Sequence, residues 1–298
     1  MPEWPGETVD VGGREVFVRR AANPDGEPAV YVHGLGGSST NWTDLMALLS
    51  DRVDGHAPDL PGHGRSAPPR SGRYPLDLHA GVVADYIASL GQGPVHLLGN
   101  SLGGAVSVRV AAEHPELVRT LTLVSPAMPQ YRLRRRNDPR IALLLVPGLS
   151  GVVSRERKRS GAERIARDVL TLCTYDLSVI HEDRIAEAVA EVRRRHRLPW
   201  SAASLTGSLR GLVGAYFDPG PRNLWRQLGQ IQAPTLVVWG DHDRLVPRNL
   251  GPLAVRRLRN GRLVTVPDAG HVAQMERPQV VAEAVRRLLD DEGLRATA

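Results

Sequence analysis

The fold of this chain is decided by Val95-His96-Leu97-Leu98-Gly99-Asn100-Ser101-Leu102-Gly103-Gly104. A short apolar run ends there in Gly-x-Ser-x-Gly and leads directly into Ala105–Ala112, a segment of helical composition. The pattern predicts a strand, one sharp turn and a helix, with Ser101 at the apex. Gly99 and Gly103 fit such a turn because it leaves no room for Cβ atoms beside the serine. The helix would direct free N–H groups and the positive end of its dipole toward Ser101, where they would stabilise a developing negative charge.

Length and composition indicate a globular α/β protein, either one large domain or a core with an insertion. Hydrophobic residues make up 42% of the 298 residues, which is enough for a buried core. Met1–Pro5 lacks the basic and then apolar layout of a signal peptide, and the apolar run Ile141–Val146 is too short to span a bilayer. The single cysteine, Cys173, excludes an intramolecular disulfide and fits a reducing compartment. We therefore expect a cytoplasmic protein.

The basic residues are almost all arginine and are concentrated in one part of the chain. The net charge is +6, Lys158 is the only lysine, and the segment 129–230 is strongly basic whereas the remainder is slightly acidic. This asymmetry fits an anionic substrate, a membrane surface, a nucleic acid or a solvated arginine-rich surface. The densest cluster, Arg132–Arg140, has only Tyr131 beside it and lacks the aromatic interleaving of a nucleic-acid platform. We favour the solvated surface and expect no nucleic-acid partner.

Strand and helix patterns alternate at both ends of the chain. Repeated strand–helix units imply a parallel sheet with helices on both faces. A hairpin opens the chain over residues 7–19. The expected strands cover 29–32, 54–57, 95–98, 120–124, 234–239 and 262–266, and the expected helices cover 41–49, 76–90, 105–112, 250–258 and 279–289.

The periodicity changes between residues 127 and 232. This segment shows helical patterns over 162–172, 182–195 and 202–215 and no convincing strand. We predict a core formed by residues 1–126 and 233–298, with residues 127–232 inserted as a helical cap, or lid. The apolar stretch Ile141–Val153 inside the insertion would be pocket wall, lid hinge or dimer surface, and the sequence leaves open a monomer or a homodimer.

Polar loops follow several of the expected strands. Open parallel sheets bind ligands at the carboxyl ends of their strands. One loop there is Gly240-Asp241-His242-Asp243, and another is Pro267-Asp268-Ala269-Gly270-His271. An acid and a base from these loops can converge on Ser101, whose hydroxyl needs an oriented base to act as a nucleophile at neutral pH. His33-Gly34-Leu35-Gly36-Gly37 follows a third strand; it exposes backbone N–H groups but lacks the Gly-Lys-Ser/Thr of a nucleotide loop.

These motifs together resemble the α/β-hydrolase superfamily, in the branch with a helical cap. The resemblance covers the whole expected core, whereas the cap matches only in position and helical character. The matching stretches are His33-Gly34-Leu35-Gly36-Gly37, Asp59-Leu60-Pro61-Gly62-His63-Gly64-Arg65-Ser66, Gly99-Asn100-Ser101-Leu102-Gly103-Gly104, Gly240-Asp241-His242-Asp243 and Gly270-His271.

The resemblance implies a catalytic triad in the order Ser, Asp, His. Ser101 would be the nucleophile, His271 the general base and then acid, and Asp243 the orienting carboxylate. Asp241 competes for the last role, but the family pattern places the acid four residues before the proline and so favours Asp243. The family uses the histidines corresponding to His33 and His63 structurally.

The resemblance also implies an oxyanion hole and a pocket. The backbone N–H groups of Leu35 and Leu102 would bind the oxyanion. No cofactor and no metal are expected. The residues that we expect around the substrate are Gly34, Gly36, Asn100, Val272 and Met275.

A serine at the apex argues against epoxide hydrolysis and dehalogenation, for which this superfamily uses a carboxylate nucleophile. We expect hydrolysis of a carboxylic ester or thioester of a small-to-medium apolar acyl group through an acyl-enzyme. Gly-Asn-Ser also resembles the hydrolases that cleave carbon–carbon bonds of ring-fission products, although Val272 and Met275 stand where those enzymes usually have aromatics. Their cap arginine has candidates here in Arg184 and Arg193–Arg195. The remaining alternatives are a small-ligand receptor without turnover and a lipid-acting enzyme at an anionic membrane surface.

Overall fold

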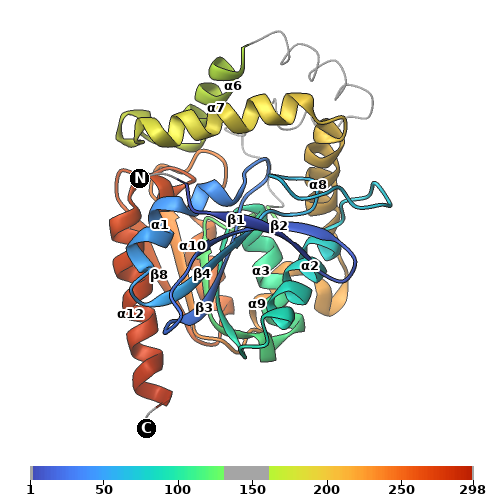
Figure 1. The fold of residues 1–298 in the computed structure, drawn as a ribbon. Helices are drawn as coiled ribbons and strands as arrows, with labels where there is room; N and C mark the ends of the chain where they lie inside the picture. Colours follow the sequence, from blue (N-terminus) through green and yellow to red (C-terminus); the bar gives the residue numbers. More distant parts are fainter. Residues whose placement is uncertain (1–2, 131–160, 297–298) are drawn as a thin grey trace.

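A mixed eight-stranded sheet forms the centre of the computed structural model, which describes residues 3–130 and 161–296 (Figure 1). The strand order is β1-β2-β4-β3-β5-β6-β7-β8. β1 pairs antiparallel with β2 and β2 with β4, and every other neighbouring pair is parallel. The expectation of a mostly parallel sheet opened by a hairpin is confirmed. The strands are β1 Gly6–Asp10, β2 Glu15–Ala21, β3 Glu27–Val32, β4 Val53–Pro58, β5 Val95–Asn100, β6 Val118–Val124, β7 Thr235–Gly240 and β8 Gly261–Val266.

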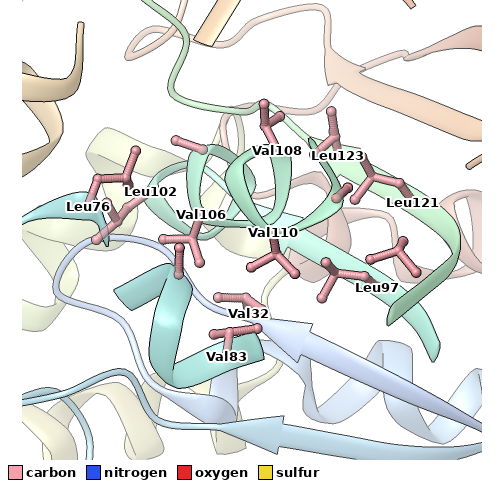
Figure 2. Close-up of a cluster of buried hydrophobic side chains, with 14 of the residues drawn as sticks. Val32, Leu76, Val83, Leu97, Leu102, Val106, Val108, Val110, Leu121 and Leu123 are labelled. Atoms are coloured by element: carbon pink, nitrogen blue, oxygen red, sulfur yellow. The ribbon is translucent and has the colours of Figure 1, made fainter. Parts of the chain in front are cut away.

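Helices cover both faces of the sheet, because successive side chains of a strand point to opposite sides. In β3, Val30 and Val32 contribute to one apolar cluster, whereas Ala29 and Tyr31 contribute to the other. Figure 2 shows part of the first cluster. The first layer contains α2 Leu76–Leu90, α3 Leu102–Glu113, α9 Leu224–Leu228 and α10 Leu250–Arg257, and the second contains α1 Thr43–Leu49 and α12 Pro278–Ala296. Strands buried on both faces explain the continuous apolar runs in the sequence.

Short helical turns connect these layers. Three 3-10 turns and one short α-helix lie in the loops of the described core and at the return from the insertion. They are η1 Ser39–Trp42, η2 Pro115–Leu117, η4 Gly220–Arg222 and α11 Ala273–Glu276. None of the helices in the described part of the chain is long and apolar enough to cross a membrane.

The described chain between β6 and β7 is helical. Its main elements are α6 Ala162–Cys173, η3 Leu177–Val179, α7 Glu182–Arg197 and α8 Ser201–Ala215. Figure 1 shows α6 and α7 beyond the edge of the sheet, and α8 running back toward α2. The same insertion contains α9, whose Leu224 and Leu228 join the first core cluster, so its last turns pack with the core. Arg132–Arg140 and Ile141–Val153 lie outside the described residues.

Glycines let α8 lie directly on the chain that precedes α2. A Cβ atom at Gly211 would be 2.1 Å from the carbonyl oxygen of Tyr74, and one at Gly207 would be 2.7 Å from the Tyr74 ring. His79 of α2 adds a polar contact, because its Nε2 lies 3.0 Å from Ser208 Oγ. This side of the insertion is therefore packed closely against the core.

Candidate active site

Ser101 occupies a strained turn between β5 and α3. Its φ of 54° and ψ of −115° lie in a region that side-chain-bearing residues rarely adopt. Such a conformation costs about 1–3 kcal/mol and persists only where the surroundings impose it. The N–H of Ser101 donates to the Val124 oxygen at 3.1 Å, and its own carbonyl accepts from Ala105 and Ala127. The predicted strand, sharp turn and helix are confirmed.

The glycines beside Ser101 are required by close backbone contacts. A Cβ atom at Gly99 would be 2.4 Å from the Gly103 carbonyl oxygen, and one at Gly103 would be 2.1 Å from the Val32 oxygen. Cβ atoms do not approach backbone oxygens this closely, so α3 can begin against the end of β3 only with glycine at these positions.

Gly103→Ala is expected to lower the free energy of unfolding by about 3 kcal/mol, because the added Cβ would clash with backbone atoms that cannot move away without distorting the sheet. Gly81→Ala is the matched control, since no atom lies within 4 Å of a Cβ at this position in α2. Alanine there is expected to leave stability unchanged or to raise it by up to about 1 kcal/mol. Urea unfolding of both variants checks this pair, and equal stabilities would contradict it.

His271 and Asp243 form a buried pair at the carboxyl ends of β8 and β7. His271 Nδ1 lies 2.9 Å from Asp243 Oδ2, and the Asp243 side chain is fully shielded from solvent. Asp243 Oδ1 accepts hydrogen bonds from the amides of Leu245 at 2.8 Å and Val246 at 2.9 Å. Burial favours the protonated acid, but the charge and hydrogen bond of His271 and these two amides outweigh it and lower the pKa of Asp243. Asp243 is therefore a carboxylate whose oxygens are both engaged.

The structure separates the two candidate acids. Asp241 Oδ1 accepts a long hydrogen bond of 3.4 Å from the Ala269 amide and lies 3.8 Å from His242 Nε2. Asp243, two residues later, is the one that contacts His271. The geometry agrees with the sequence-based choice of Asp243, whose catalytic role stays a prediction.

Asn100 connects the Ser101 turn to the loop of His271. Its Nδ2 donates to the Val124 oxygen at 3.0 Å and to the His271 oxygen at 3.1 Å. Its side-chain amide thus holds the His271 loop beside the Ser101 turn. The contact of Asn100 with substrate stays a prediction.

The turn after β3 lies against Ser101. A Cβ atom at Gly34 would be 3.2 Å from Ser101 Cβ. The Gly37 amide donates to the Gly34 oxygen at 3.0 Å, and Gly36 has a φ of 69°, so the turn is tight. Within the described residues, the N–H groups of Leu35 and Leu102 have no hydrogen-bond acceptor. Two free amides beside a serine are what an oxyanion hole requires.

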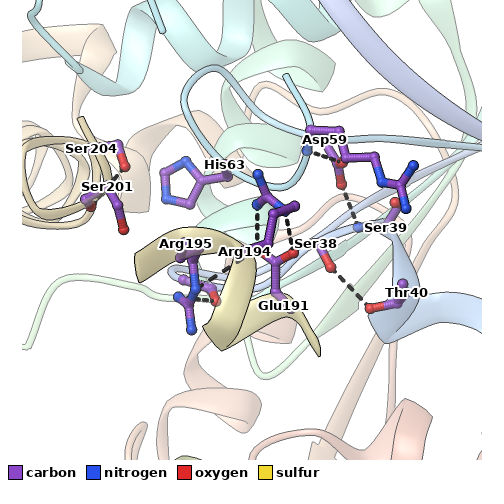
Figure 3. A network of polar contacts seen from close by, with 12 residues as sticks. Ser38, Ser39, Thr40, Asp59, His63, Glu191, Arg194, Arg195, Ser201 and Ser204 are labelled. Carbon is purple, nitrogen blue, oxygen red and sulfur yellow. Dashed lines mark hydrogen bonds and ion pairs between the residues drawn. The ribbon is translucent and has the colours of Figure 1, made fainter. Parts of the chain in front are cut away.

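Arg195 of α7 reaches this turn from the insertion. Its Nη1 donates to the Gly36 oxygen at 2.8 Å, between residues 159 positions apart in the sequence. Figure 3 shows Arg195 beside Arg194 and Glu191, with His63, Ser201 and Ser204 nearby. The sequence analysis counted Arg195 among several arginines and had no signal that singled it out, because the contact depends on how the insertion packs.

His33 braces the same turn from the core. Its Nε2 accepts from the Leu60 amide at 2.9 Å, so its Nδ1 carries the proton and donates to the Gly34 oxygen at 2.8 Å. His63 stands beside it, with ring centroids 5.6 Å apart. Asp59 holds the loop that carries His63, because its carboxylate accepts from the amides of Ser39 and Arg65 (Figure 3). Both histidines have structural surroundings, as the resemblance implies.

Three buried histidines are expected to make the fold sensitive to acid. Burial lowers the pKa of His33 to about 4 and of His63 to about 3, and that of His79 well below its usual 6.5. The unfolded chain binds protons at these side chains near pH 6.5, while the folded protein does not until the lowered pKa values are reached. The free energy of unfolding should therefore fall as the pH decreases from about 6.5 toward 4.

Urea unfolding at pH 7, 6 and 5 checks this dependence. His79→Gln should reduce the slope, because it removes one group that titrates only in the unfolded chain. Ser89→Ala, at an exposed position in α2 without a titratable side chain, should leave the slope unchanged. A free energy of unfolding that stays constant between pH 7 and 5 would contradict the prediction.

Val272 and Met275 lie in an apolar contact between the His271 loop and the insertion. Both are buried, and they cluster with Leu170, Ile180 and Ile185. Met275 Sδ also lies 3.7 Å from Asn41 Nδ2. Their contact with substrate stays a prediction. The sequence analysis gave no individual role to Glu276, whose buried carboxylate bonds backbone amides of both the loop and the insertion.

Comparisons with known proteins agree with this architecture. Residues 28–278 match the family described as the alpha/beta hydrolase fold. A 2-hydroxy-6-oxononadienedioate/2-hydroxy-6-oxononatrienedioate hydrolase of Klebsiella pneumoniae is 30% identical over 274 residues, which cover 90% of this chain and 89% of that protein. A dihydrolipoyllysine-residue acetyltransferase component of the acetoin cleaving system of Cupriavidus necator is also 30% identical, but this chain spans only 65% of its length.

A solved structure shows the same fold at low sequence identity. The crystal structure of a putative lipase from Acinetobacter baumannii superimposes with a TM-score of 0.79 and is 20% identical. The match covers 98% of this chain and 92% of that one. Within the described residues, no group of three or more His, Cys, Asp or Glu side chains is placed to hold a metal ion. The family match extends over most of the chain and includes the serine turn and both loops, so the protein belongs to the α/β-hydrolase family.

Proposed function

We propose that this protein is a serine hydrolase that cleaves a carboxylic ester or thioester with an apolar acyl group. The observation that carries the proposal is the buried Asp243–His271 pair, whose loop is bonded through Asn100 to the strained turn of Ser101. Two amides have no acceptor in the described structure: Leu102, which follows the serine, and Leu35, in the turn whose Gly34 lies against Ser101. In the proposed function, these residues would supply the nucleophile, the base, the orienting acid and the oxyanion donors at one edge of the sheet.

The reaction follows from these positions. His271 keeps its Nδ1 proton and donates a hydrogen bond from it to Asp243, so Nε2 is the base that takes the proton of Ser101 Oγ as it attacks the carbonyl carbon. The amides of Leu35 and Leu102 bind the oxyanion, and one such donor contributes about 3 kcal/mol to the transition state. His271 then gives its proton to the leaving alcohol or thiol. His271 then takes a proton from water, which attacks the acyl-enzyme, and returns that proton to Ser101 Oγ as the acid leaves.

Hydrolysis of p-nitrophenyl esters with increasing acyl length tests the proposal. We expect turnover with an optimum that reports the size of the acyl pocket, and covalent labelling by a fluorophosphonate. Tight binding of a small ligand with neither turnover nor labelling in the folded protein would contradict the proposal and favour a receptor.

A second candidate is hydrolysis of a carbon–carbon bond in a 2-hydroxy-6-oxo-dienoate. The observation that favours it is Arg195, which places a guanidinium from the insertion at the Leu35–Gly36 turn. A guanidinium binds a carboxylate through paired N–H donors, and such substrates carry one. The Klebsiella pneumoniae relative is named for hydrolysis of a dioate of this kind.

The two candidates are separated by comparing a dienoate with a neutral ester. Arg195→Gln should raise KM for the dienoate about tenfold or more if its carboxylate binds the guanidinium, while KM for a neutral ester changes little. Arg193→Gln on the exposed side of the same helix is the control. Equal KM changes for both substrates would remove the support that Arg195 gives to the second candidate.

A further inference from the structure

The loop that carries His271 is bonded to the inserted helices at one compact contact. The His271 amide donates to the Cys173 oxygen at 2.7 Å. Glu276 Oε1 accepts from the amides of Tyr175 at 2.7 Å and Asp176 at 3.2 Å, and its Oε2 accepts from the Gly270 amide at 2.5 Å. We call this contact, formed by residues 173–176, 270–271 and 276, the clasp.

The two sides of the clasp approach as closely as backbone allows. A Cβ atom at Gly270 would be 2.5 Å from the Cys173 oxygen and 2.7 Å from the Tyr175 nitrogen. Cys173 is the last residue of α6, so its carbonyl is one that the helix leaves without an internal partner. The His271 amide supplies that partner. The end of α6 and the His271 loop therefore complete each other's hydrogen bonding.

Glu276 joins the two sides through one buried carboxylate. The residue is 4% exposed. Burial raises the pKa of its carboxyl, and the hydrogen bonds from the three backbone amides oppose this rise. Hydrogen bonds to an ionised acceptor are about twice as strong as neutral ones. Glu276 lies at the end of α11 and contacts Gly270 on one side and Tyr175 and Asp176 on the other. Neither side can move without losing these bonds.

The clasp also contacts the loop of Asp243. The Tyr175 ring stacks on His242, the residue before Asp243, with centroids 4.0 Å apart and planes 15° apart. The backbone of His271 is thereby held on both sides, its N–H by Cys173 and its C=O by Asn100. The same insertion segment thus borders the base and the residue next to the orienting acid.

We propose that Glu276 is a positioning residue for His271, which it holds in register with Asp243 and Ser101 by binding the Gly270 amide and the insertion segment 173–176 together. The proposal rests on the proposed function, in which His271 is the base. Misplacement of a catalytic group by about 1 Å can cost about 10²-fold in rate. Glu276 uses both oxygens on backbone amides, so its loss should reduce kcat and leave KM nearly unchanged.

Glu276→Gln tests the proposal, because the amide replaces one acceptor by a donor that faces a backbone N–H. We expect kcat for a p-nitrophenyl ester to fall about 10- to 100-fold with KM within about twofold. Glu276→Asp keeps the charge but shortens the side chain, so it reaches one side of the clasp and should give a smaller loss. Glu283→Gln in α12, an exposed glutamate paired with Arg287, is the control and should match wild type.

Two further readouts distinguish positioning from a purely structural role. Hydrogen exchange at the amides of Gly270, His271 and Tyr175 should accelerate in Glu276→Gln and not in Glu283→Gln. The downfield proton resonance of the His271 Nδ1–H, bonded to Asp243, should broaden or disappear in the same variant. Both readouts are made on the folded protein and need no substrate.

The outcomes are separable from those that test the proposed function. Unchanged kcat and unchanged rate of fluorophosphonate labelling in folded Glu276→Gln would overturn the positioning role, as would a loss of stability alone with normal kcat per folded molecule. Absence of turnover and labelling in the wild-type protein would instead contradict the proposed function. This second test uses the wild-type protein alone and needs no variant.

Discussion

Ser101→Ala is expected to abolish ester turnover and fluorophosphonate labelling. The serine oxygen is the only group in the proposed mechanism that forms a bond to the acyl carbon, so its removal leaves only the oxyanion donors and substrate binding. In a serine hydrolase this change lowers kcat by about 10⁶-fold. The loss should appear in kcat, because the backbone amides and the pocket that bind the substrate are retained.

The variant is suitable because alanine can keep the backbone conformation and the backbone hydrogen bonds of this position. Ser101 has a φ of 54°, and its N–H and C=O are bonded to the Val124 oxygen and to the Ala105 and Ala127 amides. None of these contacts uses the hydroxyl. Ser89→Ala, at an exposed site in α2, controls for the loss of a serine hydroxyl elsewhere. Persistent labelling of folded Ser101→Ala would contradict the assignment of the nucleophile.

Asp243→Asn is expected to lower kcat by about 10⁴-fold while the protein stays folded. Asp243 Oδ1 accepts from two amides, at Leu245 and Val246, so the asparagine oxygen is required on that side. The NH₂ group must then face His271 Nδ1, which can meet it only as an acceptor. The ring proton moves to Nε2, and His271 can no longer take the proton of Ser101.

Asp241→Asn is the matched control for this change. Asp241 lies in the same loop, and among the described residues its side chain makes a long hydrogen bond to the Ala269 amide and approaches His242. We expect its kcat to stay within a few-fold of wild type. A large loss in Asp241→Asn with little loss in Asp243→Asn would reverse the assignment of the orienting acid. Steady-state kinetics on one p-nitrophenyl ester, with folding checked by circular dichroism, measures both variants.

Much of the fold could be predicted from local patterns in the sequence. The predicted helix 76–90 matches the bounds of α2, and the predicted strands 29–32 and 120–124 lie inside β3 and β6, which begin two residues earlier. Periodicity of apolar residues is a property of neighbouring positions, so a single sequence contains it. The order of the strands is not local, and the antiparallel pairing of β2 with β4 became evident only from the structure.

The candidate site divides in the same way. Ser101, Asp243 and His271 each follow a strand, and parallel strands bring their carboxyl ends to one edge, so their convergence could be expected before any coordinates. The strained φ of Ser101 was likewise implied by the glycines around it. Asn100 was expected near the site as a residue around the substrate, and its hydrogen bond to the His271 oxygen was not predicted.

The sequence by itself therefore determined the serine turn and the α/β alternation, because turn chemistry and strand ends are local features. The resemblance to a known family then singled out the three residues proposed for catalysis. Only the tertiary structure decided which insertion residues support them. Arg195 meets Gly36 across 159 positions, and Glu276 meets Tyr175 across 101. These contacts depend on where the inserted helices pack against the core. The periodicity and the motifs of either segment do not specify which distant residues will meet.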